Sequence, residues 1–237
     1  MDDPAIPAAT LVVMRPAAAG GPPELLMVTR PAAMAFAGGA MVFPGGRVDP
    51  ADREIDPASA DGFRIAAIRE TLEEAGIPIG LSPLPTPTLS LSLQDALHDG
   101  ADFASLLAEH HIGFDLAALV PFARWQPAFH QARRFDTMFF LAEASAGDWT
   151  PHPQPGECDA AQWLSASAVL EQIAAGTATA IYPTLRNLER LAQFASFEEA
   201  SAHAHAHPIE IITPWIEEVD GEQWLRIPDH LGYPVTG

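Results

Sequence analysis

The chain has 237 residues, of which 48% are hydrophobic, and it carries a formal net charge of −19 at pH 7. This length suits one domain with extensions, or at most two. The acidic balance argues against a general nucleic-acid binder, because phosphate contacts need clustered cations. No apolar run reaches the roughly 18 residues of a transmembrane helix, and the acidic N-terminus does not resemble a signal peptide. The single cysteine, Cys158, fits a reducing compartment, so we expect a cytoplasmic protein with no membrane partner.

The first part of the chain predicts short strands, a glycine turn and one well-defined helix. Residues 10–15 and 24–30 are typical of two paired strands. Phe43-Pro44-Gly45-Gly46 indicates a forced turn at the end of a third strand. Residues 47–60 are rich in Asp and Pro and are expected to form a loop, whereas residues 63–75 are expected to form a helix.

The helix expected over residues 63–75 carries three acidic side chains close together. At about 100° per residue, Glu70, Glu73 and Glu74 lie within one turn and can share a face. Another side offers an apolar stripe that can be buried, made of Ile65, Ile68 and Leu72. Gly76 is the expected end of the helix, because glycine adopts the left-handed conformation without strain. Like charges this close repel, and a divalent cation with oxygen ligands resolves the repulsion, which favours Mg²⁺, with Mn²⁺ as the alternative.

The rest of the chain predicts further strands and helices, followed by a tail. Residues 78–92 contain several prolines and are expected to be irregular, and residues 93–110 have helical spacing that breaks near Gly100. Two strands, a Pro-rich loop, a short strand and a helix are expected over residues 119–125, 135–142, 149–157, 160–164 and 167–175. In the tail we expect a helix over residues 183–194, a helix opened by a capping box at Ser196, and β-like segments over residues 209–212 and 223–227.

The glycine turn followed by the acidic helix resembles the Nudix box. In that family the pattern is Gly, five residues, Glu, seven residues, Arg-Glu, an apolar residue, any residue, Glu-Glu, any residue, Gly and an apolar residue. The chain matches this pattern at Gly46, Arg69, Glu70, Glu73, Glu74, Gly76 and Ile77. Its loop is nine residues longer, so the loop acid is Asp52 when counted forward from Gly46 and Asp61 when counted back from Arg69. Thr71 also stands where an apolar residue is usual.

Other segments resemble the peroxisomal-type coenzyme A diphosphatase branch of this family and its bacterial relatives. These are Gly39-x-x-x-Phe43-Pro44-Gly45-Gly46, residues 133–140, and a long tail that ends in Leu231-Gly232-Tyr233-Pro234. The resemblance implies an α/β (α+β) fold, an α/β/α sandwich around a mixed sheet. It also implies a hydrolase domain over residues 1–176 with an insertion over about 78–110, and a mostly helical extension over residues 177–237 packed on that domain.

The resemblance implies a Mg²⁺-dependent hydrolase that cleaves the diphosphate of a nucleoside diphosphate linked to another group. CoA or acyl-CoA, giving 3′,5′-ADP and a phosphopantetheine, is the favoured small-molecule substrate. Within the enzyme class, ADP-ribose, NADH, dinucleoside polyphosphates and nucleotide sugars are alternatives. A Nudix-fold binding module without turnover is the alternative from another class, although a pure binder has no need for the complete set of glutamates. A homodimer is one option for the oligomeric state.

The resemblance also implies roles for single residues. The metal ligands that it implies are Gly45, through its carbonyl, and Glu70, Glu73 and Glu74. The catalytic residues that it implies are Glu70, Glu73 and Arg69, of which Arg69 would hold the carboxylates by a bidentate pair. A further acidic ligand usually comes from a later loop, for which Glu157 is the candidate. The alternative for Glu157 is an ordinary exposed loop acid.

Three arginines and two aromatic residues are candidates for contacts with the substrate. Arg30, Arg47 and Arg134 could meet substrate phosphates, and an ordinary surface or ion-pair role is the alternative for each. Phe36 and Trp125 could stack on a base, and burial in the core is the alternative for both.

Three histidines alternate with alanine in the tail. In a strand His203, His205 and His207 would share one face and resemble a soft-metal site, whereas in a helix continued from Ser196 they would not. We expect a polar tail segment without a ligand role.

Overall fold

The protein is described here from a computed structural model, which covers residues 4–34, 37–55, 62–127, 134–147, 149–219 and 221–237. Its strands are β1 (Ile6–Arg15), β2 (Glu24–Thr29), β3 (Met41–Val42), β4 (Gly45–Arg47), β5 (Leu81–Ser82), β6 (Gly113–Phe114), β7 (Val120–Trp125), β8 (Phe135–Glu143), β9 (Ala160–Ser165), β10 (Ile211–Ile212), β11 (Trp215–Val219) and β12 (Glu222–Arg226). Its α-helices are α1 (Pro50–Ile55), α2 (Phe63–Ala75), α3 (Pro87–His98), α4 (Phe103–Glu109), α5 (Ala166–Ala174), α6 (Tyr182–Leu191) and α7 (Phe197–His205). Short 3₁₀ turns occupy Leu116–Ala118 and Asp229–Leu231.

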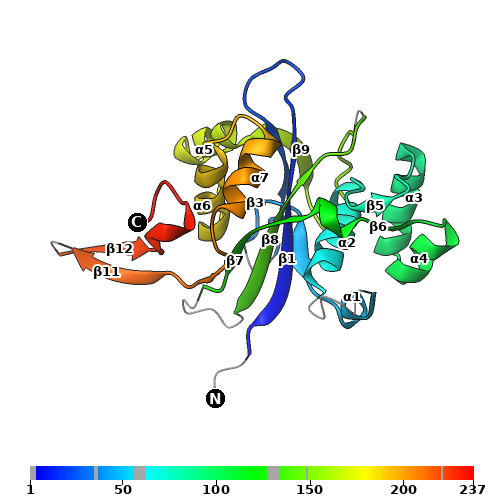
Figure 1. Cartoon of the computed structure of the whole chain (residues 1–237), viewed down its shortest axis with the longest axis horizontal. Coiled ribbons are helices and arrows are strands. Elements are labelled where there is room, and N and C mark those ends of the chain that lie inside the picture. The colour runs from blue at the N-terminus through cyan, green and yellow to red at the C-terminus, as the bar shows by residue number, and fades with distance from the viewer. Residues whose placement is uncertain (1–3, 35–36, 56–61, 128–133, 148, 220) are drawn as a thin grey trace.

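A mixed β-sheet forms the centre of the molecule (Figure 1). In the described part of the chain its strand order is β10-β7-β8-β1-β2-β3, with β4 also paired to β1 and β9 to β2. Strand β1 runs parallel to β8 over nine residue pairs, from Ile6 opposite Phe135 to Met14 opposite Glu143. The same strand is antiparallel to β2 and to β4. The paired first strands and the mixed α/β sheet that the sequence predicts are therefore confirmed.

The sheet is buried on both faces. Successive side chains of a strand point to opposite sides, and here both sets are apolar and buried. Along β1, Leu11 and Val13 belong to one apolar cluster, whereas Val12 and Met14 belong to the other. Strand β8 divides in the same way, with Phe140 in the first cluster and its neighbours in the second. Such runs of apolar residues are typical of strands covered by helices on both sides.

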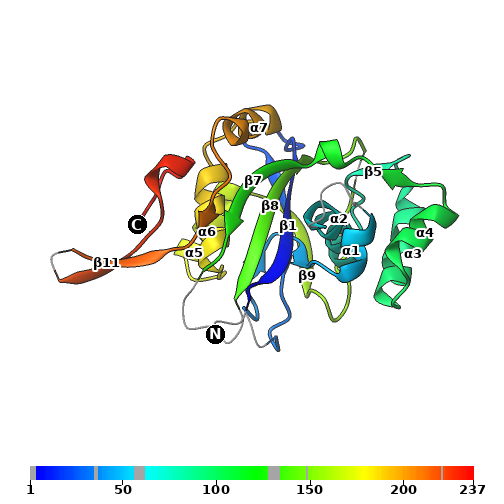
Figure 2. The same cartoon turned by 60° about the horizontal axis from the view of Figure 1, so that its bottom comes forward.

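Each apolar cluster belongs to one layer of helices. Helix α2 covers the first cluster, and α3 and α4 contribute their apolar residues to the same cluster on the outer side of α2. Helices α5, α6 and α7 cover the second cluster on the opposite face of the sheet, as Figures 1 and 2 show. The α/β/α sandwich is thus built partly from residues after 176, because α6 and α7 supply one of its outer layers. The proposed boundary between a domain and an extension at residue 176 stays a prediction.

Several local expectations were wrong. Residues 50–55 form α1 and not a loop, and the acidic side chain of Asp52 in this helix is almost fully buried. Residues 78–92 are not irregular throughout, because they contain β5 and the first turns of α3. Helix α3 begins at Pro87 behind the N-cap Thr86, whose side chain accepts a hydrogen bond from the Leu89 amide. Proline suits this first helical position, since it has no N–H to lose there.

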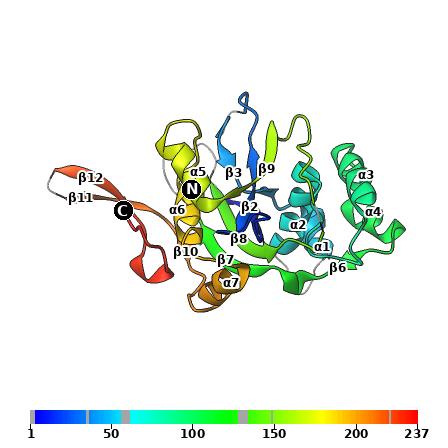
Figure 3. The same ribbon diagram turned by 90° about the horizontal axis from the view of Figure 1, so that it is seen from above.

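The tail contains a two-stranded hairpin that extends away from the body of the molecule (Figure 3). The sequence predicts its second strand, β12, but not β11, whose residues are all exposed and lack an alternating pattern. After the hairpin the chain returns to the body, where Leu231 and Tyr233 are buried in the second cluster. No helix in the described part of the chain is long and apolar enough to cross a membrane.

Candidate active site

Helix α2 is fixed to the sheet by its apolar side, as the sequence predicts. Ile65, Ile68 and Leu72 are fully buried. The helix ends at Gly76, which has a φ of 67° and donates its amide hydrogen to the Leu72 carbonyl. Thr71, the polar residue at a usually apolar position, is also buried, and its hydroxyl donates to the Ala67 carbonyl at 2.7 Å. This local hydrogen bond satisfies the hydroxyl, so a threonine is tolerated inside the core.

The glycine turn at the start of β4 lies directly against the acidic helix. The amide of Gly45 donates a hydrogen bond to Oε2 of Glu74, 3.0 Å away. A side chain on Gly46 would collide with the carboxylate of Glu70, and one on Gly45 would collide with the backbone of β1. Gly45 therefore needs glycine because its neighbours are backbone atoms, whereas a Cβ at position 46 would displace the carboxylate of Glu70.

Arg69 links the carboxylates of the site to one another. Its Nε and Nη2 donate to the two oxygens of Asp52 at 3.0 and 2.9 Å, which is a bidentate pair. Its Nη1 donates to Glu70 at 3.0 Å and to Glu73 at 3.3 Å, and its Nη2 also donates to the carbonyl of Arg47. Asp52, counted forward from Gly46, is thus the loop acid that meets Arg69, whereas Asp61 lies outside the described residues.

Burial disfavours the charged forms of the acidic side chains of α2. Burial raises the pKa of Glu70 to about 7, with Glu73 adding repulsion and Arg69 opposing the shift. Burial likewise raises the pKa of Glu73, and it raises that of Glu74 well above its ordinary value, to which Glu70 also contributes. The charges of Asp52 and Glu70 hold the pKa of Arg69 above its ordinary value in spite of burial. Burial, with repulsion between the carboxylates as a smaller cause, therefore disfavours the charged forms of all three glutamates.

A later loop, residues 149–159, attaches to the C-terminal end of α2. The amides of His152 and Gln154 donate to the carbonyls of Ala75 and Glu74. The buried thiol of Cys158 also points to the Glu74 carbonyl, with Sγ 3.1 Å from the oxygen. Burial raises the pKa of this thiol to about 11, which fits a structural role and not a nucleophile.

This attachment brings Glu157 to the cluster. Its charge contributes to the raised pKa of both Glu73 and Glu74, and its side chain is half-buried. The electrostatic contact supports the choice of Glu157 as the acid from a later loop. Its role as a metal ligand stays a prediction.

The chemistry of these donors fits a divalent cation such as Mg²⁺. Glu70, Glu73, Glu74 and Glu157 offer carboxylate oxygens, the ligands that Mg²⁺ and Mn²⁺ prefer. A cation would stabilise the charged forms that burial disfavours. Among the described residues no three acidic, histidine or cysteine side chains are already arranged as an ion cage. Arg69 instead bridges Glu70 and Glu73. The ligand roles of the three glutamates and of the Gly45 carbonyl stay predictions.

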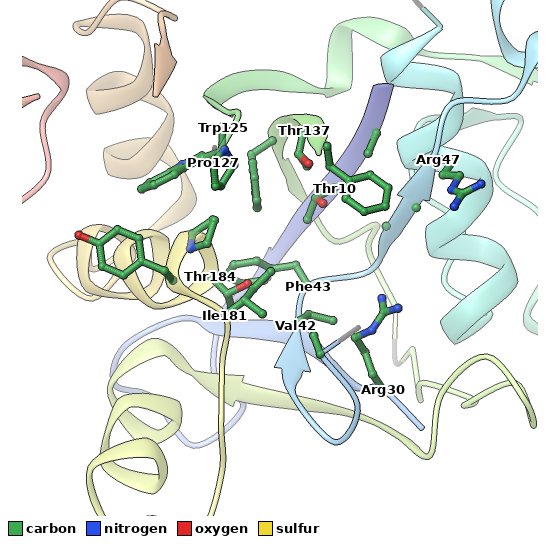
Figure 4. A pocket seen from close by; sticks show the side chains of 18 of the residues that line it. Thr10, Arg30, Val42, Phe43, Arg47, Trp125, Pro127, Thr137, Ile181 and Thr184 are labelled. Carbon is green, nitrogen blue, oxygen red and sulfur yellow. The ribbon is translucent and has the colours of Figure 1, made fainter. Parts of the chain in front are cut away.

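A cavity of about 860 Å³ opens beside the glycine turn (Figure 4). It lies on the sheet face opposite α2, because Ala8 and Thr10 of β1 line it and share the parity of Val12. Gly45 and Gly46 form part of its wall. The turn therefore has the carboxylates of α2 on one side and the cavity on the other.

The two ends of the cavity differ in chemistry. Arg30 and Arg47 lie on the side of the glycine turn, and Trp125, Ile181 and Thr184 lie at the far side, as Figure 4 shows. Phe43, Phe135, Phe139 and Tyr182 add further aromatic wall. The cavity thus offers cations near the carboxylates and an apolar surface away from them, in the size range of small-molecule sites.

The structure separates the three candidate arginines. Arg30 lines the cavity, its charge acts on Glu74, and its Nε is buried without a hydrogen-bond partner among the described residues. Arg47 lines the cavity and stacks over Phe135 at 5.9 Å. Arg134 precedes β8 and does not belong to the cavity wall as described. Substrate contacts of all three stay predictions.

The structure treats the aromatic and histidine residues singled out in the sequence differently, by their positions relative to the cavity and the helices. Trp125 is fully buried, which confirms the alternative of burial in the core, and it also contributes to the cavity wall. Its stacking on a base stays a prediction. Phe36 lies outside the described residues. Residues 197–205 are helical, so the arrangement on a strand does not occur. His203 and His207 stack at 4.2 Å, whereas His205 bonds to its own helix at Ser201.

Sequence reasoning missed Tyr182, Tyr233 and Asn187 as parts of the site region. Tyr182 lines the cavity, and Tyr233 and Asn187 hold Trp125 from behind. The only local signal is Pro183, which marks the start of α6 and hence the residues beside it. Their contacts with one another join segments far apart in the chain.

The search against protein-family models gave no match. A crystal structure of a Nudix hydrolase from Alicyclobacillus acidocaldarius is 32% identical, with a TM-score of 0.75, over 84% of this chain and 96% of that one. The acyl-coenzyme A diphosphatase NUDT19 of Homo sapiens is 27% identical over 81% of this chain, and the putative nudix hydrolase 7 of Caenorhabditis elegans is 29% identical over 72%. The chain spans 67% of the human relative and 56% of the nematode one.

The likeness to the bacterial hydrolase extends over nearly the whole of that protein. The chain belongs to the Nudix hydrolase family and is an enzyme of that family.

Proposed function

We propose that the enzyme hydrolyses the diphosphate bond of CoA or acyl-CoA in a Mg²⁺-dependent reaction, giving 3′,5′-ADP and phosphopantetheine or its acyl derivative. One observation carries this proposal: the glycine turn has the carboxylates of α2 on one side and, on the other, forms part of the wall of a cavity that is cationic near the turn and apolar at the far end. A diphosphate with a long, weakly polar arm matches that order of surfaces. Mn²⁺ is the alternative metal ion.

The carboxylate cluster suits the hydrolytic step. Glu70, Glu73 and Glu74 would hold the metal, with Glu157 and the Gly45 carbonyl as further ligands. When bound, Mg²⁺ polarises phosphoryl oxygens and stabilises the charge that develops on them. Arg69 keeps Glu70 and Glu73 in place through its hydrogen bonds to both, and Asp52 orients Arg69 in turn.

The basic residues of the cavity suit the diphosphate itself. The buried Nε of Arg30 needs an acceptor, because leaving a buried N–H without one costs free energy. A phosphate oxygen in the cavity is an acceptor of the right charge. Arg47, at the exposed edge of β4, can meet a second anionic group of the substrate.

Two comparisons support the choice of CoA. The human relative is named an acyl-coenzyme A diphosphatase, and the residues before the box resemble those of the CoA diphosphatases. If the substrate were ADP-ribose or a dinucleotide, its second ribose or base would lie at the far end of the cavity. The apolar wall at that end favours a pantetheine arm or an acyl chain instead.

The test is a substrate panel with the purified full chain and Mg²⁺. CoA, dodecanoyl-CoA, NADH, ADP-ribose and diadenosine polyphosphates are incubated separately, and the products are identified by mass spectrometry. We expect turnover of CoA and dodecanoyl-CoA to 3′,5′-ADP, and loss of turnover when EDTA removes the metal. Hydrolysis of ADP-ribose or NADH in preference to both CoA substrates would overturn the proposal.

A further inference from the structure

The far end of the cavity is formed by residues that the tail of the chain holds in place. Trp125, at the end of β7, forms part of this wall together with Ile181, Tyr182 and Thr184 at the start of α6. The rings of Trp125 and Tyr182 meet edge to face, with centroids 6.0 Å apart. Trp125 and Tyr182 belong to the second cluster, on the face of the sheet opposite α2, and Figure 4 shows Trp125 away from Arg47.

Tyr233 supports Trp125 from behind the wall. The indole Nε1 of Trp125 donates to the hydroxyl of Tyr233 at 3.1 Å, and the two rings pack edge to face at 5.7 Å. The hydroxyl in turn donates to Oδ1 of Asn187 at 2.7 Å. Burial raises the pKa of Tyr233 to about 12, so the hydroxyl keeps the proton that it donates. All three side chains are buried.

The support continues behind Tyr233. The guanidinium of Arg190 stacks over the ring of Tyr233 at 5.1 Å and over the ring of Phe122 at 4.1 Å. It also donates to the carbonyl of Phe122 at 3.0 Å. Tyr233 is therefore enclosed on several sides, and the position of its hydroxyl is well defined.

A second contact joins the tail to the other half of the wall. The hydroxyl of Tyr182 donates to the carbonyl of Leu225, in strand β12 of the hairpin, at 2.9 Å. Two aromatic residues of the far wall, Trp125 and Tyr182, are thus each hydrogen-bonded to the last part of the chain. Rigid placement of such residues is what allows a wall to discriminate between ligands.

We propose that the tail segment 225–233 determines which substrate group the far end of the cavity accepts. Tyr233 is the positioning residue that holds Trp125 against an acyl chain. This inference rests on the proposed function, because it assigns the apolar end of the same cavity to the acyl part of acyl-CoA. The diphosphate would lie at the other end, near the glycine turn and the arginines. Tyr233 would then affect binding of the acyl group and not the hydrolytic step.

The test compares Tyr233→Phe with the wild-type enzyme on free CoA and on dodecanoyl-CoA. The variant keeps the ring but leaves the Trp125 N–H and the Asn187 oxygen without their shared partner. We expect the KM for dodecanoyl-CoA to rise roughly tenfold with kcat unchanged, because the lost contact stabilises ground and transition states alike. Both constants for free CoA should stay within about twofold. Trp224→Ala, at an exposed position of the hairpin, is the matched control and should leave KM and kcat for both substrates unchanged.

A purely structural role of Tyr233 gives a different result. If the variant lowers kcat/KM for CoA and dodecanoyl-CoA by the same factor, or changes neither, the proposal is wrong. Thermal melting of each variant shows whether it is folded under the assay conditions. If Tyr233→Phe is too unstable to assay, Asn187→Ala replaces it, because this variant removes the acceptor of the Tyr233 hydroxyl. It should raise the KM for dodecanoyl-CoA alone, and equal changes on both substrates or no change on either would overturn the proposal.

Binding separates this inference from the proposed function. Isothermal titration calorimetry in EDTA measures CoA and dodecanoyl-CoA binding without turnover. If the wild-type protein hydrolyses neither compound, the proposed function fails. The inference survives only if dodecanoyl-CoA still binds more tightly than CoA and Tyr233→Phe removes that difference. Equal binding of the two compounds, or no binding of either, overturns it.

Discussion

The two ends of the cavity are built in opposite ways. The carboxylate end depends on residues 45–76, in which a glycine turn and one helix supply most of the contacts. The apolar end joins Trp125, Tyr182 and Tyr233, and the hydrogen bond between the first and last of these spans 108 positions of the chain. A compact motif can thus carry the chemistry of a site while distant segments shape what it accepts.

This contrast predicts that changes at the two ends affect different kinetic constants. Changes at the carboxylate end should lower kcat for every substrate that the enzyme accepts, because the diphosphate is common to them. Changes at the apolar end should raise KM for acyl substrates alone. Assays with CoA and dodecanoyl-CoA in parallel measure both effects with one enzyme preparation.

The largest effect is expected for Glu73→Gln. This change removes one negative charge from the proposed metal site and should lower kcat about 10³-fold with both substrates. Because burial already raises the pKa of Glu73, the neutral isostere should not lower the melting temperature. Glu171→Gln, at an exposed position of α5, is the control and should retain full activity. A wild-type rate for Glu73→Gln would refute the assignment of this residue.

A large effect on stability is expected for Asp52→Ala. It leaves Arg69 in a buried position without its bidentate partner, which should lower the free energy of unfolding by about 3 kcal/mol. Asp49→Ala is the control, because the Asp49 carboxylate is 3.7 Å from the same guanidinium but 62% exposed, and such pairs contribute about 1 kcal/mol or less. Urea denaturation measures both. Equal losses of unfolding free energy in the two variants would show that the Asp52–Arg69 pair contributes no more than an exposed ion pair.

An intermediate effect on activity is expected for Gly46→Ala. The new Cβ would occupy the space of the Glu70 carboxylate and displace it, and a misplaced catalytic group typically costs about 10²-fold in rate. Gly113→Ala is the control, because its Cβ would make only an ordinary contact with the Ser82 carbonyl. The ratio of KM values for dodecanoyl-CoA and CoA should stay unchanged. A shift in that ratio would show that the two ends are coupled through the turn.

Much of the carboxylate end could be predicted from the sequence, because its residues lie close together in the chain. The apolar stripe of Ile65, Ile68 and Leu72 and the end of the helix at Gly76 were all predicted and confirmed. The choice between Asp52 and Asp61 stayed open, since the two counts through the lengthened loop disagree. Helix α1, which carries Asp52 to Arg69, has only six residues and lies in an Asp- and Pro-rich segment, so the sequence does not show helical periodicity there.

The apolar end could not be predicted in the same way. Trp125 and Tyr233 are each surrounded by residues that suggest only a strand and an irregular tail. Their pairing depends on the packing of α6 against the sheet, which places Asn187 and Arg190 against Tyr233. Side-chain contacts of this range follow from tertiary structure, and no local periodicity encodes them.

The smallest effect is expected for Tyr182→Phe, which removes the hydrogen bond to the Leu225 carbonyl. Tyr182 is only half-buried, so water can replace the lost partner, and a net hydrogen bond of about 0.5–1 kcal/mol corresponds to a two- to fivefold change. We therefore expect a rise of that size in the KM for dodecanoyl-CoA, smaller than that of Tyr233→Phe, with the constants for free CoA unchanged. Steady-state kinetics on both substrates, with Trp224→Ala as the control, checks the order. A Tyr182→Phe effect equal on both substrates would place this residue with the carboxylate end, and a larger acyl-specific effect than that of Tyr233→Phe would make Leu225 the main attachment of the wall.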